Sequence, residues 1–219
     1  MLRMKWIVVL PGLLAVLPGL TLASGLLFHD GFETCWHRAL TKPAFLTLLH
    51  DSVDGTNGCV PPQSGTEFGI TYTACNTPNG CGTGVPGCAV AMQAGAFSGD
   101  FLAGSFTAPG TASNVAIPID AGFLGACTLN LTAITLRYDL DYLVRVDGVD
   151  GVHAEDLATP VVEILDYTRT HDCNIVIAGF IDSYTPQAIA SAEAGASAAI
   201  EPPLRTNTVG QSVCPLSAP

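Results

Sequence analysis

Three of the five histidines are followed directly by an aspartate, and imidazole and carboxylate groups are common metal ligands. Adjacent residues in an extended chain point to opposite faces, so each pair would offer one inward ligand at most. The sequence has no H-E-x-x-H or similar spacing that would place two ligands on one helix face. We therefore expect no metal site and no cofactor from these pairs, which are His29-Asp30, His50-Asp51 and His171-Asp172.

A serine nucleophile of the α/β-hydrolase type needs a glycine two residues before it and another two residues after it. Gly195-Ala196-Ser197 has the first glycine without the second, and it lies in an alanine-rich segment typical of a helix. Local motifs therefore predict no catalytic residue. A hydrolase whose site is assembled from distant residues stays an alternative, with His153 or His171 beside nearby carboxylates as its candidates.

Two segments rich in Asp and Gly, residues 51–58 and 147–151, vaguely resemble calcium-binding loops. Neither has the twelve-residue ligand pattern of such a loop. Asp, Gly and Asn are also the residues that most turns use. We predict turns in both segments.

The eight cysteines are an even number, which in an oxidising compartment indicates up to four disulfides. No C-x-x-C is present, so neither a redox-active dithiol nor the commonest structural zinc arrangement is expected. Spacing does not decide the pairing, because eight cysteines allow about 105 connectivities. The residues concerned are Cys35, Cys59, Cys75, Cys81, Cys88, Cys127, Cys173 and Cys214.

The N-terminus has the order of a secretory signal. Arg3 and Lys5 precede an apolar run over residues 6–22, and small residues follow at Thr21 and Ala23. We predict a signal peptide over residues 1–24 and an exported protein, extracellular or periplasmic. An uncleaved membrane anchor is the alternative, although two Pro-Gly pairs interrupt the run.

Removal of residues 1–24 would take away two of the eight basic residues and none of the 19 acidic ones, leaving a net charge of about −13. A chain this acidic repels phosphate backbones and anionic headgroups, so nucleic acid is not expected as a partner. No later segment approaches the length of a membrane span, so no stable span is expected after processing.

The composition divides the remaining chain in two. Residues 25–87 are rich in Gly, Pro and Cys, and such a segment needs crosslinks to stay ordered. Residues 88–219 combine a β-rich part with a helical C-terminal segment, and we expect one domain to contain both parts. The expected strands before the longest one are 68–73, 89–97, 101–107 and 115–120, with turns at 98–100 and 108–110.

The strongest periodicity lies in residues 134–147, where seven apolar residues alternate with residues that are polar in six of seven cases. Only a strand with one buried face produces this pattern. Residues 127–131 alternate in the opposite phase, so we predict a bulge near Ala133-Ile134. The turn at 147–151 then leads into a return strand over about 152–167, interrupted at Thr159-Pro160.

Helical spacing begins after Cys173, with apolar residues at 176, 177, 180, 181 and 184. Thr185-Pro186 has the form of an N-cap with proline at N1, so we expect two short helices or one helix kinked at Pro186. Pro202-Pro203 is expected to end the helical segment. The predicted fold class is α+β: an antiparallel sheet with a long bent hairpin, C-terminal helices packed on one face, and a loop-rich N-terminal part tied by disulfides.

Residues Phe28-His29-Asp30-Gly31-Phe32-Glu33 resemble the F-x-D-G-F-E opening of uncharacterised exported proteins of gammaproteobacteria and their relatives. This resemblance covers eight residues with the two leucines before it, and it implies compartment and lineage alone. The long bent hairpin followed by a helix is similar in architecture to half of a tubular lipid-binding domain of the bactericidal/permeability-increasing type. That likeness implies an apolar ligand.

The leading interpretation is an exported, non-catalytic binding or surface-associated protein, with an apolar molecule or a cell-surface component as its partner. Alanines in the C-terminal helix could leave room for such a molecule beside the half-apolar strand. An ordinary core closed by the helix is the simpler alternative. A secreted hydrolase and a structural or adhesive surface component are the alternatives from other functional classes.

Overall fold

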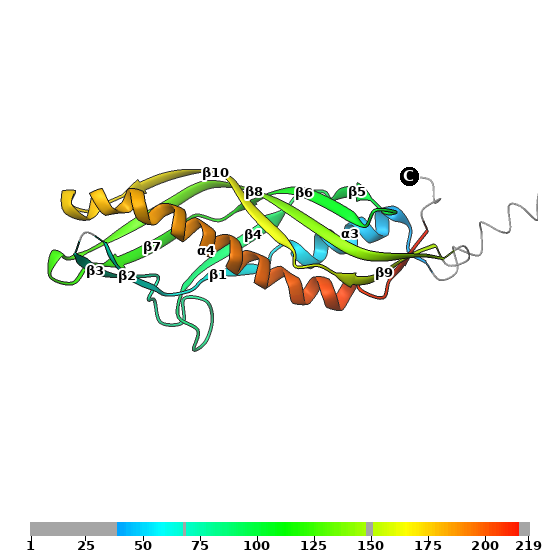
Figure 1. Ribbon diagram of the computed structural model, residues 1–219, viewed down its shortest axis with the longest axis horizontal. Coiled ribbons are helices and arrows are strands. Elements are labelled where there is room, and N and C mark those ends of the chain that lie inside the picture. Colours follow the sequence, from blue (N-terminus) through cyan, green and yellow to red (C-terminus); the bar gives the residue numbers. More distant parts are fainter. Residues whose placement is uncertain (1–38, 68, 148–150, 215–219) are drawn as a thin grey trace, which may run out of the picture.

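A computed structural model describes residues 39–67, 69–147 and 151–214. In these residues an antiparallel sheet and two α-helices form an elongated molecule (Figure 1). The predicted α+β class is confirmed.

The helices are α3 (Lys42–Val53) and α4 (Ile175–Thr208), and Gly122–Leu124 is a 3-10 helix (η2). The strands are β1 (Asn57–Val60), β2 (Gln63–Glu67), β3 (Ile70–Ala74), β4 (Cys88–Ala94), β5 (Ser98–Asp100), β6 (Ser105–Ala112), β7 (Val115–Asp120), β8 (Ala126–Asp147), β9 (Gly151–Leu157), β10 (Val161–His171) and β11 (Ser212–Val213).

Strand β8 is the central strand of the sheet, with 22 residues and partner strands along both edges. On one edge it pairs with β6 and then β7, and on the other with β9 and then β10, all antiparallel. The predicted long hairpin is therefore present, and its return strand is interrupted at residues 158–160 as expected. The predicted turn at 147–151 lies partly outside the described residues.

The predicted bulge is also present. Ala133 has φ of 50°, a left-handed conformation that interrupts the pleat. Leu131 and Ile134 lie on either side of it, and both side chains are buried. The extra residue thus keeps the two phases of apolar residues on the same inner face. Val146 departs from the pattern, because 62% of it is exposed at the far end of the strand.

The N-terminal strands belong to the same sheet. Its order is β1-β4-β6-β8-β7-β3-β2, with β10 on the other edge of β8. The prediction of disulfides is confirmed: the described pairs are Cys59–Cys81, Cys75–Cys88 and Cys127–Cys173, and Cys214 is bonded as well. Cys35 lies outside the described residues. Two of these bridges hold the long connection between β3 and β4.

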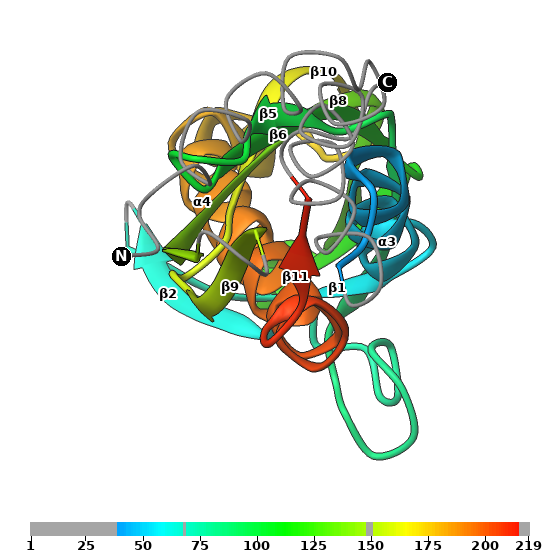
Figure 2. The same cartoon turned by 90° about the vertical axis from the view of Figure 1, so that its right-hand side faces the viewer.

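Helix α4 closes the sheet into a tube. Strands β1 and β10 lie at opposite edges of the path through β4, β6 and β8, and α4 contacts both of them. The end-on view shows strands and helices arranged in a ring around the long axis (Figure 2). None of the helices in the described residues has both the length and the hydropathy of a membrane span.

Helix α4 begins at its N-cap Asn174, whose side chain accepts hydrogen bonds from the amides of Val176 and Ile177. It is one helix of 34 residues that includes Pro186. The predicted end at Pro202-Pro203 is wrong, because the helix continues to Thr208. Burial explains this outcome: Ile200, Leu204 and Thr208 are spaced by four and fully buried, so packing outweighs the two missing amides.

Two predicted turns are wrong. Ala108-Pro109-Gly110 lies inside β6, where Pro109 is opposite Arg137 of β8. Its missing amide is tolerated because the ladder with β4 ends at Gly110. Ser98–Asp100 is the short strand β5, and the turn follows it at residues 101–104, where a strand was expected.

Helix α3 was not predicted. Its sequence signal is nevertheless present, since Thr41 caps it, proline lies in its first turn, and Phe45, Leu49 and Val53 are buried at a spacing of four.

Candidate functional site

An apolar cavity lies inside the tube, between the sheet and the middle of α4. Its volume is about 20 Å³. Strands β1, β4, β6, β7, β8 and β10 contribute aliphatic side chains to its wall, and α4 contributes Ala192 and Ala196. The small side chains of these two alanines leave the space unfilled. Glu193 is the one lining residue that is not apolar.

The wall of the tube is tightest where α4 crosses β1. A methyl group on Gly195 would lie 2.0 Å from the carbonyl oxygen of Cys59, and one on Gly58 would lie 3.2 Å from the Cα atom of Ala196. Small residues on both elements therefore allow the backbones to approach directly. This contact fixes one edge of α4 to the sheet.

The opposite edge of α4 is joined to β10 through side chains. The amide of Ile164 donates to Oε1 of Glu193 at 2.9 Å, and the amide of Val162 donates to Oγ of Ser197 at 3.1 Å. These bonds satisfy edge amides that another strand would otherwise bind. We call this boundary the α4–β10 seam. Because these bonds run from backbone amides to side chains, separating α4 from β10 would break no ladder between strands.

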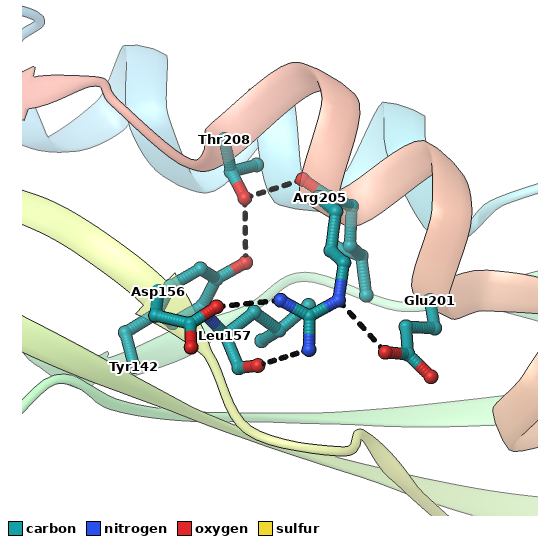
Figure 3. A network of polar contacts seen from close by, with 7 residues as sticks. Tyr142, Asp156, Leu157, Glu201, Arg205 and Thr208 are labelled. Carbon is teal, nitrogen blue, oxygen red and sulfur yellow. Dashed lines mark hydrogen bonds and ion pairs between the residues drawn. The ribbon is translucent and has the colours of Figure 1, made fainter.

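An arginine contact lies near each end of α4. Near the start of α4, Arg169 donates to Oδ1 of Asp182 at 2.7 Å. Near its end, Arg205 donates to Asp156 at 2.5 Å, to the carbonyl of Leu157 at 2.6 Å and to Glu201 at 2.7 Å (Figure 3). The Arg205 contacts link α4 to the end of β9.

A buried hydroxyl pair lies beside this arginine network. Thr208 donates to the carbonyl of Leu204, and the Tyr142 hydroxyl lies 2.8 Å from Oγ1 of Thr208 (Figure 3). Burial raises the pKa of Tyr142 to about 12, so this phenol stays protonated and donates the bond.

The hydrogen bond from Arg205 holds the pKa of Asp156 below its ordinary value of 3.8. A carboxylate with a lowered pKa stabilises the folded state above that ordinary value, and this contribution disappears as the pH falls through the folded-state pKa. We expect Asp156→Asn to lower the melting temperature near neutral pH. The difference from the wild type should shrink to nothing in melts taken progressively below pH 3.8. A difference that is the same at every pH would contradict this role of the ion pair.

The histidines in the part of the chain that the structure covers do not converge on one site. His50 belongs to α3. This helix lies beside the end of α4, as the hydrogen bond from Asn207 to Ser52 shows. His171 ends β10 beside the start of α4, and a helix of 34 residues is about 50 Å long. Asp172 accepts a hydrogen bond from the amide of Thr128. His29 and Asp30 lie outside the described residues.

His153 lies between β9 and β11, where its Nδ1 atom is 2.7 Å from Oγ of Ser212. A catalytic arrangement would need a carboxylate on the other nitrogen to orient the ring. Within the described part of the chain the buried Nε2 atom has no hydrogen-bond partner. The pair therefore lacks the third member of a hydrolytic triad in the residues that the structure covers.

The other residues with potential for metal chemistry have structural roles. Cys127, Asp172 and Cys173 lie close enough to suggest a metal site, but both sulfur atoms are in one disulfide. In the first calcium-like segment, Oδ1 of Asp54 accepts a hydrogen bond from the amide of Ala94. Sequence reasoning pointed to the alanines of α4 and the apolar face of β8. It missed the lining from β1, β4, β6, β7 and β10, whose residues have only apolar burial in common.

No protein-family model and no curated protein matches the chain. Among solved structures, it is similar to a crystal structure of lipopolysaccharide binding protein, with a TM-score of 0.41 and 13% sequence identity. The match covers 74% of this chain and 35% of that one, so the chain spans about a third of the length of that structure. A likeness at this level says nothing about ligand or activity.

Proposed function

We propose that the protein is an exported, non-catalytic binding protein whose ligand is an apolar molecule held inside the tube. The observation that carries this proposal is the apolar cavity beneath Ala192 and Ala196, in the helix that closes the sheet. Its aliphatic wall favours hydrocarbon and offers almost nothing to a polar substrate. The disulfides support an oxidising compartment, and so an exported protein.

The small free volume means that a ligand larger than a few atoms must displace α4. The α4–β10 seam is the side on which this displacement costs least, since the Gly195 contact holds the other side. A bound chain would then lie along β8, whose buried face runs from Cys127 to Tyr142. Each methylene transferred from water to this interior contributes about 0.8 kcal/mol.

Titration with a fluorescent long-chain fatty acid tests the proposal. Ala192→Leu fills the cavity, and we expect it to weaken binding by about tenfold or more. Ala194→Leu is the matched control, because the same change is made two residues away at an exposed position. Equal affinity of the two variants, both folded by circular dichroism, would remove the cavity as the binding site.

A further inference from the structure

One end of the long axis carries exposed apolar side chains from two elements. Phe123 of η2 is 94% exposed, Ile175 is 89% exposed and Val176 is 51% exposed. The turn between β7 and β8 and the start of α4 lie at the same end of the molecule (Figure 1). Nδ2 of Asn174 donates to the carbonyl of Leu124 at 2.9 Å. We call Phe123, Leu124, Ile175 and Val176 the apolar tip.

The apolar tip is rigidly supported from behind. The disulfide Cys127–Cys173 joins the start of β8 to Cys173, the residue before the N-cap of α4. A fixed pair of projecting side chains loses little conformational freedom when it binds, which favours association. Among the large apolar side chains exposed in the described residues, those of Phe123 and Ile175 are the two most exposed.

Backbone polar groups at the tip are bonded internally. In the turn, the amides of Ala121, Leu124 and Gly125 donate to carbonyls of the same turn, and the amide of Gly122 donates to Asp120. At the helix, the Asn174 side chain caps two amides. Transfer of the tip into hydrocarbon therefore avoids much of the desolvation penalty that an open turn would bring.

The charge pattern selects the kind of surface. Residues 121–127 and 173–181 contain no charged side chain. Directly behind them, the exposed residues Asp120 and Asp172 have carboxylates held by backbone amides. At headgroup depth these carboxylates complement the quaternary ammonium of choline, and they repel anionic headgroups.

We propose that the apolar tip docks the protein onto a zwitterionic phospholipid surface, with Phe123 and Ile175 inserted between the lipids. A projecting apolar end fits a deformable lipid surface, and it needs no complementary groove in a partner. Docking is a separate property from the binding of a ligand inside the tube, and neither depends on the other.

The test is flotation of the purified chain with phosphatidylcholine vesicles. We expect the double variant Phe123→Ser/Ile175→Ser to partition about tenfold or more weakly than the wild type, because two large side chains no longer leave water. Leu143→Ser and Leu165→Ser are matched controls, since these leucines are 64% and 54% exposed away from the tip. Leu143 is about 55 Å along β8 from the tip. Both controls should partition like the wild type.

A tryptophan reporter adds a direct reading of insertion. The emission of Phe123→Trp, after subtraction of the wild-type signal, should shift to the blue with phosphatidylcholine and be quenched by brominated acyl chains. Phosphatidylglycerol vesicles should give a weaker response. Equal partitioning of the wild type and the double variant would overturn the proposal. The proposal would also be overturned if the wild type self-associated without binding vesicles and the double variant no longer self-associated. The partner at the apolar tip would then be a second copy of this chain.

Discussion

Gly195→Ala is expected to destabilise the protein by about 3 kcal/mol, although alanine is the better helix former. The added methyl group would lie 2.0 Å from the carbonyl oxygen of Cys59, and a backbone atom cannot swing aside as a flexible side chain can. The helix must then move away from β1. Equilibrium unfolding in urea gives this difference in the free energy of unfolding.

Gly179→Ala is the matched control in the same helix. No atom lies within 4 Å of the position that a methyl group on Gly179 would take. The same chemical change should therefore stabilise the protein by about 1 kcal/mol through helix propensity. If both variants were stabilised, the close approach of α4 to β1 would be wrong, and with it the closure of the tube.

Removal of the Cys127–Cys173 disulfide by a double change to alanine is expected to lower the free energy of unfolding by about 4 kcal/mol. The bridge spans 46 residues, and the entropy that a crosslink removes from the unfolded chain grows with the logarithm of this number. It also joins the start of β8 to the start of α4, so its loss should loosen the apolar tip.

The other bridges provide the comparison. Cys59–Cys81 spans 22 residues and Cys75–Cys88 spans 13, so their removal should cost about 3.4 and 3 kcal/mol. Each double variant is unfolded in urea under oxidising conditions with the other bridges intact. The reverse order of effects would show that native packing, and not the span of the loop, decides the contribution of each bridge.

Periodicity predicted the centre of the fold from the sequence. A strand with one buried face produces the alternation through residues 134–147 and its change of phase at Ala133. Both features can be recognised in the sequence without knowledge of the partner strands. The disulfides followed from composition in the same way, although their pairing depends on which loops meet in space.

The errors arose where tertiary contacts override local preference. Pro109 suggested the end of a strand and Pro202 the end of a helix, but each lies where its missing amide is tolerated. Pro109 follows the last residue pair of the ladder between β4 and β6. Pro202 lies on the outer side of a helix whose inner side is buried. The close contact of Gly195 with Cys59 and the cavity beneath Ala192 depend on the crossing of α4 over β1. No residue type or spacing in the sequence predicts where two elements will cross.

The binding of an apolar molecule inside the tube is tested most directly by what the purified protein carries. The full chain, purified without detergent, is extracted with organic solvent, and the extract is analysed by mass spectrometry. We expect an apolar molecule in extracts of the wild type, of Ala194→Leu and of Phe123→Ser/Ile175→Ser, and its absence from Ala192→Leu. Repeated extracts of the wild type without any such molecule would contradict the account.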